Sequence, residues 1–67
     1  MKWIEKSKDG EKQWFLYDDV GRVHCHIYET YMGTFGAVDT SEETSVSIGT
    51  FISLNYAKKY AKDFFGA

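Results

Sequence analysis

The residues whose types and spacing could do the most chemistry are His24, Cys25 and His26. Two imidazoles at positions i and i+2 of a strand lie on one face and could chelate a metal ion. Cys25 would point to the opposite face, and a structural zinc site needs four ligands. The chain has no further His or Cys, so Glu5, Glu29 or a second subunit would have to complete the site. We therefore expect two half-exposed strand histidines and a buried thiol, with no metal and no cofactor.

Catalytic chemistry finds little support in the same segment or elsewhere. Cys25 would need a histidine base beside it, but adjacent residues of a strand point to opposite faces. The carboxylate pairs at 18–19 and 42–43 lie in turn-like segments, which is typical of solvated charge and not of an acid–base pair in a cleft. The glycines of 33–36 come without the lysine of a phosphate-binding loop. We expect a protein that is not an enzyme.

Aromatic side chains are the most informative feature of the composition, since Trp, Tyr and Phe make up 18% of the 67 residues. A domain this small cannot bury all of these rings, because its surface is large relative to its volume. Exposed Tyr and Trp favour contact with a partner. The sequence therefore predicts a protein that binds something.

Length and composition indicate a single domain over residues 1–67 with a small core. The hydrophobic share of 43% is that of a globular chain, and the net charge of −2 favours neither nucleic acid nor an acidic mimic. There is no apolar run of membrane-spanning length and no signal-like segment. The start at Met1 favours a complete small gene product, and the single cysteine fits a reducing compartment. We expect a cytoplasmic location.

Alternation of polar and apolar residues predicts a series of short β-strands. The dipeptide Asp9-Gly10 is a strong hairpin signal between the first two strands, and 39–43 is a polar loop. Gly33 and Gly36 weaken the fourth strand and indicate a bulge, a bend or a close approach of another group. The expected strands cover residues 2–6, 12–18, 22–29, 31–38 and 44–51.

Two of these strands define the faces of the sheet. Alternation in the third strand predicts one face with Val23, Cys25 and Ile27 and another with His24, His26 and Tyr28. The second strand contains four consecutive apolar or aromatic residues, Trp14 to Tyr17, so it places rings on both faces. If Trp14 and Leu16 face the core, Phe15 and Tyr17 are exposed. In the opposite register these two replace Leu16 in the core, and Trp14 joins the exposed patch.

The end of the chain is predicted to be a helix that begins after Ser53, whose hydroxyl can accept a hydrogen bond from a free amide of the first turn. Gly66 is a plausible C-terminal cap. Apolar residues at helical spacing form the expected buried stripe, which consists of Leu54, Ala57, Ala61 and Phe64. The lysines of this segment, Lys58, Lys59 and Lys62, are expected to face water.

Strands followed by one helix, with connections of hairpin length, predict an α+β fold. We expect an antiparallel β-sheet of three to five strands with one C-terminal α-helix packed on one face. The opposite face is then open and carries at least two rings of the second strand. The expected core consists of Leu16, Val23, Cys25, Ile27, Val46, Ile48, Leu54, Ala57, Ala61 and Phe64.

An exposed aromatic sheet surface with a rim of mixed charge matches the composition of protein–protein interfaces. We therefore expect a protein partner, a category that includes a second copy of the chain. The candidate binding residues are Trp3, Trp14, Phe15, Tyr17, His24, His26 and Tyr28. The alternative is single-stranded nucleic acid stacked on the same rings. Its phosphates would be met by Lys2, Lys6, Lys12 and Arg22, although the net negative charge weakens this alternative.

The C-terminal third of the chain adds a resemblance. The segment Gly49-Thr-Phe-Ile-Ser-Leu-Asn-Tyr-Ala-Lys-Lys-Tyr-Ala61 resembles the strand-to-helix ending G-x-F-x-S-L-x-x-A-K-x-x-A of small orphan proteins encoded by tailed bacteriophages. The alternating aromatic strands and the absence of proline are similar to the same group. The resemblance implies a protein that binds a host protein in the host cytoplasm and redirects or blocks it. It transfers no functional residue, because the matching positions are structural.

Overall fold

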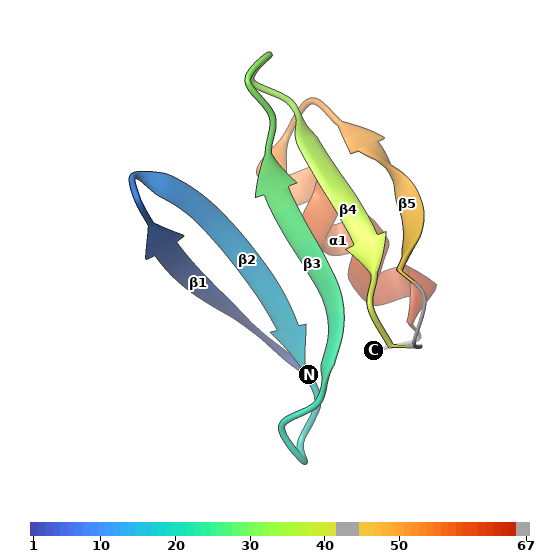
Figure 1. The fold of residues 1–67 in the computed structure, drawn as a ribbon. Helices are drawn as coiled ribbons and strands as arrows, with labels where there is room; N and C mark the ends of the chain where they lie inside the picture. The colour runs from blue at the N-terminus through green and yellow to red at the C-terminus, as the bar shows by residue number, and fades with distance from the viewer. Residues whose placement is uncertain (42–44, 66–67) are drawn as a thin grey trace.

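A computed structural model of the chain describes residues 1–41 and 45–65. In these residues a five-stranded β-sheet is followed by one α-helix (Figure 1). The elements are β1 (Lys2–Lys8), β2 (Glu11–Tyr17), β3 (Val23–Glu29), β4 (Phe35–Asp39), β5 (Val46–Phe51) and α1 (Leu54–Phe64). The predicted α+β fold, with an antiparallel sheet and a C-terminal helix, is confirmed.

The sheet is a meander in which each strand pairs with its neighbour in sequence. The spatial order is β1-β2-β3-β4-β5, and all four pairings are antiparallel. The helix lies behind one face and contacts β3, β4 and β5 (Figure 1). No described element covers the opposite face, which we call the open face.

Local sequence explains the first turn and the start of the helix. Asp9 and Gly10 both have positive φ, 53° and 81°, as the tight turn of a two-residue hairpin requires. The Ser53 hydroxyl accepts a hydrogen bond from the amide of Tyr56 and caps the helix. The expected cap at Gly66 lies outside the described residues, as do 42–43 of the expected polar loop. The fourth strand begins only at Phe35, because the preceding residues form the β3–β4 turn.

Register shifts in the β2–β3 and β4–β5 pairs break the simple alternation of the strands. In the β2–β3 pair, Leu16 lies opposite Cys25 but Tyr17 lies opposite Val23, which leaves His24 as the extra residue of a β-bulge. The His24 ring turns toward the C-terminal end of α1, where its centroid lies 5.7 Å from that of Phe65. The prediction that His24 shares a face with His26 and Tyr28 is therefore wrong, because alternation does not continue through a bulge.

The core lies between the sheet and the helix. Register places Trp14 and Leu16 of β2 on the helix side, and Ala57 and Ala61 let the helix approach the sheet closely. The buried hydrophobic residues are Trp14, Leu16, Cys25, Ile27, Ala37, Ala57 and Ala61. Partly buried residues packed around them are Trp3, Phe35, Ile48, Phe51, Leu54 and Phe65.

Two residues of the expected core are exposed. Val46 is 56% exposed because it begins β5, the last strand of the sheet, and no other strand among the described residues lies beyond it. Phe64 is 55% exposed, since the next residue, Phe65, packs against the core in its place. Val23 was expected in the core on one face with Cys25 and Ile27, but beyond the bulge it pairs with the open-face residue Tyr17 and is only partly buried.

Candidate binding surface on the open face

Four rings from two adjacent strands form a continuous row on the open face. Tyr17 and Phe15 come from β2, with ring centroids 6.5 Å apart. His26 of β3 stacks on Phe15 at 4.7 Å with planes 3° from parallel. Tyr28 follows His26 at 5.8 Å. We call these four residues the open-face row. They lie together because β2 residues of odd number face away from the core, and register sets Phe15 directly opposite His26.

Lys6 of β1 completes one side of this row. Its Nζ donates a hydrogen bond to the Tyr17 hydroxyl at 3.0 Å. The same ammonium lies 5.3 Å from the Phe15 ring centroid and 5.6 Å from that of Tyr17, within the range of cation–π attraction. Since β2 lies between β1 and β3, Phe15 has Lys6 on one side and His26 on the other. The Phe15 ring therefore presents its edge to a partner and not a free face.

At the other side of the row, the Tyr28 ring lies over Gly36 of β4. Register pairs Tyr28 with Gly36 of β4, and a Cβ added to Gly36 would lie 2.5 Å from Tyr28 Cζ. The absence of a side chain at Gly36 is what lets the ring lie against the sheet. Of the bulge, bend or close approach that the glycines indicated, Gly36 provides the close approach. Tyr28 remains 40% exposed, which makes it the most accessible ring of the row.

His26 sits in the middle of the row as a neutral ring. Burial lowers its pKa below the ordinary value of 6.5, because desolvation disfavours the charged form. Its Nε2 is buried and has no hydrogen-bond partner. The site therefore offers an uncharged, stacked imidazole near neutral pH.

The two tryptophans predicted for the surface lie on the other side of the sheet. Trp14 is only 4% exposed and packs edge-to-face against Phe35 at 5.8 Å, while its Nε1 donates to Glu5 Oε1 at 3.1 Å. Trp3 is partly buried against the core, and the Lys58 ammonium lies 6.0 Å from its ring centroid. With His24 displaced by the bulge, four of the seven predicted binding residues come together and three do not.

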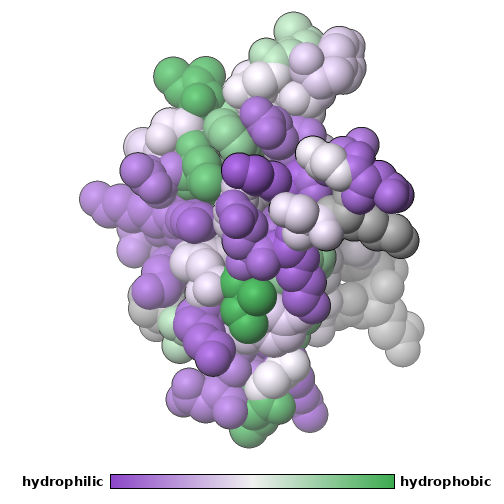
Figure 2. All heavy atoms as spheres, turned by 90° about the vertical axis from the view of Figure 1, so that its left-hand side faces the viewer, coloured by the Kyte–Doolittle hydropathy of each residue, from purple (hydrophilic) through white to green (hydrophobic). Residues whose placement is uncertain are grey.

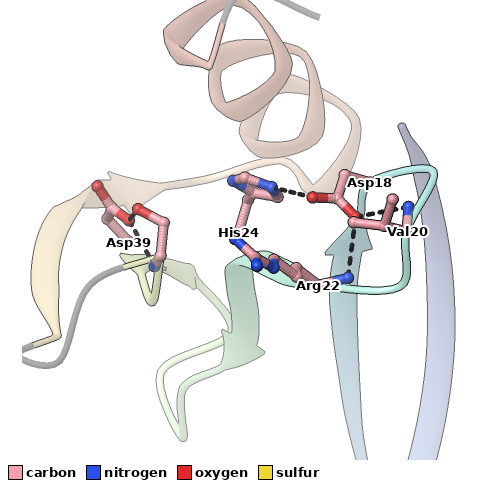
Figure 3. A network of polar contacts seen from close by, with 6 residues as sticks. Asp18, Val20, Arg22, His24 and Asp39 are labelled. Atoms are coloured by element: carbon pink, nitrogen blue, oxygen red, sulfur yellow. Dashed lines mark hydrogen bonds and ion pairs between the residues drawn. The ribbon is translucent and has the colours of Figure 1, made fainter.

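His24 belongs instead to a polar network at the β2–β3 turn (Figure 3). Its Nε2 lies 2.8 Å from Asp18 Oδ2. Asp18 Oδ1 accepts from the backbone amides of Val20 at 3.0 Å and Arg22 at 2.9 Å. The hydrogen bond from His24, followed by that from the Arg22 amide, lowers the pKa of Asp18 from 3.8 to about 2. The network holds the turn and joins it, through His24 and Phe65, to the end of the helix.

The segment His24 to His26 contains the side chains that suggested metal or thiol chemistry. In the part of the chain that the structure describes, no three His, Cys, Asp or Glu side chains are grouped as metal ligands. Cys25 is fully buried, and burial raises the pKa of its thiol from 9.0 to about 11. The thiol therefore packs as a small hydrophobic group and is a poor nucleophile near neutral pH.

Sequence reasoning missed a second group of exposed rings on α1. Tyr56, Tyr60 and Phe64 are 61%, 43% and 55% exposed. Their spacing of four residues was the available signal, since it places them on one side of a helix. Phe51 of β5 lies 5.7 Å from Tyr56 and 5.2 Å from Tyr60, measured between ring centroids. A further ring, Tyr31, is 99% exposed at the tip of the β3–β4 turn.

Comparisons with protein-family models, curated proteins and solved structures find no match for this chain. Within the described residues, no helix has the length and apolar character needed to span a membrane.

Proposed function

We propose that this protein is a non-catalytic binding module that recognises a protein partner through the open-face row. The observation that carries the proposal is the continuity of four rings on a sheet face that no described element covers. Aromatic residues are enriched in protein–protein interfaces and supply most of their binding hot spots. Rings already fixed by stacking also lose little side-chain freedom on binding.

The rim of the row indicates what kind of partner surface fits. Lys2 and Lys6 both lie on the open-face side of β1, because they pair with Tyr17 and Gln13. This margin is basic, although the chain as a whole has a net charge of −2. A partner with an apolar pocket and an acidic residue beside it would meet both the rings and the lysines.

The surroundings of Phe15 favour a protein over single-stranded nucleic acid. A base needs a free ring face on which to stack, and Phe15 has His26 on one side and Lys6 on the other. Lys12 is one of the cations expected to contact phosphates. It alternates with Trp14 and Leu16 of β2 and therefore lies on the helix side of the sheet, away from the open-face row.

The resemblance of the C-terminal third to small phage-encoded proteins supports a host protein as the partner. In this proposal, binding in the host cytoplasm redirects or blocks that protein. The open-face row supplies the contact, Cys25 packs in the core on the other side of the sheet, and Asp18 and His24 hold the β2–β3 turn.

The first experiment is affinity capture from bacterial lysate by the immobilised protein, with and without nuclease. Tyr28→Ala and Tyr17→Ala remove rings of the row, and Tyr31→Ala is the matched control because its ring is exposed elsewhere. We expect a discrete protein that survives nuclease, is lost with the first two variants and is kept by the third. Circular dichroism checks that each variant is folded.

Direct titration of the purified captured protein against the same variants then measures affinity. Capture that disappears with nuclease would assign the row to nucleic acid. Equal affinity for the parent and for Tyr28→Ala and Tyr17→Ala would place the contact on another surface. Either result would contradict the proposal.

A further inference from the structure

The two edges of the sheet differ in charge. The edge strand β1 carries Lys2, Glu5 and Lys6, all exposed. Figure 2 views the molecule from this side and shows a mostly hydrophilic surface with isolated hydrophobic spots. The other edge strand, β5, has the sequence Val-Ser-Ile-Gly-Thr-Phe, with no charged residue and no proline. Natural proteins commonly protect free edges with charge, proline or a β-bulge. Charge is present on β1 and absent from β5, whose pairing with β4 contains a bulge.

The two sides of α1 also differ: the side near β5 carries aromatic rings, and the side near β1 carries Lys58. Tyr56, Tyr60 and Phe64 follow one side of α1, and the contacts of Tyr56 and Tyr60 with Phe51 place this side next to β5. Lys58 is on the opposite side, with its ammonium over Trp3 of β1. We call the outer edge of β5, together with these three exposed rings, the β5-side patch.

We propose that a second copy of this chain docks on the β5-side patch, with the two β5 strands pairing antiparallel about a two-fold axis. This interface is distinct from the open-face row and does not depend on the function proposed for it. The two sheets would become one, and the two rows would lie on one continuous face.

The register of β5 makes the strand complementary to itself. Val38 pairs with Ser47 and Ala37 with Gly49, so Ile48 is the extra residue of a bulge and packs toward the core. The bulge puts Ser47 on the same face as Thr50, and Val46 on the same face as Phe51. Directly opposed residues of an antiparallel pair share a face.

A two-fold axis between Ile48 and Gly49 would place residues of the same face opposite one another. It would set Ser47 opposite Thr50 of the second copy, hydroxyl against hydroxyl on the open face. It would likewise set Val46 opposite Phe51 on the helix side. A regular strand without the bulge would place these residues on opposite faces.

Charge complementarity also points to a second copy. Lys59 and Asp63 line a shallow hollow on the helix together with Tyr56 and Tyr60. The two charges are opposite in sign and one turn apart, so two copies related by a two-fold axis can bring Lys59 of one near Asp63 of the other. An interface between identical surfaces requires this kind of self-complementarity.

Sedimentation velocity of the full chain, from micromolar to millimolar concentration, tests the proposal. We expect a concentration-dependent dimer. Lys59→Asp should weaken it by about tenfold or more, because like charges then meet across the axis. Combining Lys59→Asp with Asp63→Lys should restore it. Lys62→Asp, the same charge change elsewhere on the helix, is the control.

Amide hydrogen exchange locates the interface independently of any variant. Dimerisation should slow exchange at those β5 amides that point away from β4. Thr50→Lys, on the exposed edge of β5, serves as a second variant if Lys59→Asp does not fold, with Ser7→Lys on β1 as its control.

A chain that stays monomeric at all concentrations would overturn the proposal and show that the bulge alone protects the β5 edge. A dimer that withstands Lys59→Asp or Thr50→Lys, with β5 amides unchanged, would place self-association elsewhere and also overturn it. Protection of β5 only on addition of another protein would assign the edge to that partner instead.

Discussion

His26 stacks on Phe15 directly across the β2–β3 pair, with ring centroids 4.7 Å apart and planes 3° from parallel. This contact joins the two halves of the open-face row, because Tyr17 lies beyond Phe15 and Tyr28 beyond His26. The row is thus held by side chains of both strands and forms on folding. Its central member is also an ionisable group, and this makes the stability of the sheet sensitive to pH.

We expect stability to fall as pH decreases through the ordinary pKa of histidine, owing to His26. The pKa of His26 is lowered in the folded state. Below about pH 6.5, His26 of the unfolded chain therefore binds a proton that His26 of the folded chain does not. His26→Phe keeps a ring on Phe15 and removes this dependence. Urea unfolding of both proteins between about pH 7.5 and pH 5 measures the difference. Parallel pH profiles of the two proteins would contradict the prediction.

Gly36 and Tyr28 should be energetically coupled. Gly36→Ala places a methyl group where the Tyr28 ring lies, at 2.5 Å from Cζ, so the ring must leave the sheet. We expect the double-mutant cycle with Tyr28→Ala to give a coupling free energy of about 0.5–3 kcal/mol. In the Tyr28→Ala background, Gly36→Ala should be neutral or stabilising. Additive effects on the free energy of unfolding would show that the ring does not need the glycine.

Asp18 should contribute stability that is lost in acid. Its pKa is lowered from 3.8 to about 2, so its contribution is complete above the unfolded value and disappears as pH falls through the folded value. Asp18→Asn should melt at a lower temperature than the parent near neutral pH, and the difference should shrink toward pH 2. Thermal melts of both proteins between neutral pH and about pH 2 measure this difference in melting temperature. Asp19→Asn, at an exposed neighbour, should leave the profile unchanged.

Cys25 should be unreactive in the folded protein. The thiol is fully buried and its pKa is raised to about 11, so both access and the thiolate fraction are low. We expect modification by an aromatic disulfide reagent at neutral pH to proceed at the rate of unfolding. Full reaction in urea provides the reference. Immediate stoichiometric reaction of the native protein would contradict the burial of this residue.

Local features made most of the architecture predictable from sequence. The Asp9-Gly10 turn and the Ser53 cap each depend on residues within a few positions of one another, and both occur as expected. That the open face carries at least two rings of β2 followed from the run of apolar and aromatic residues from Trp14 to Tyr17. These signals need no knowledge of distant contacts.

The positions of individual rings depended on long-range pairing, which alternation alone does not encode. Trp14 faces the core because β2 adopts one of two registers that the sequence left open. His24 leaves the row because of an extra residue in the β2–β3 pair. Phe64 is exposed because Phe65 occupies the core position at the end of the helix.

The meander order also determines how the protein can fold during synthesis. All strand pairs join segments adjacent in the chain, so each hairpin can close as soon as its two strands have left the ribosome. Ala57 and Ala61, which seal the core, are translated after every strand. The nascent chain therefore carries an uncovered apolar sheet, with Leu16 and Ile27 exposed, until the helix emerges. We therefore expect the nascent chain to be most prone to aggregation just before that step.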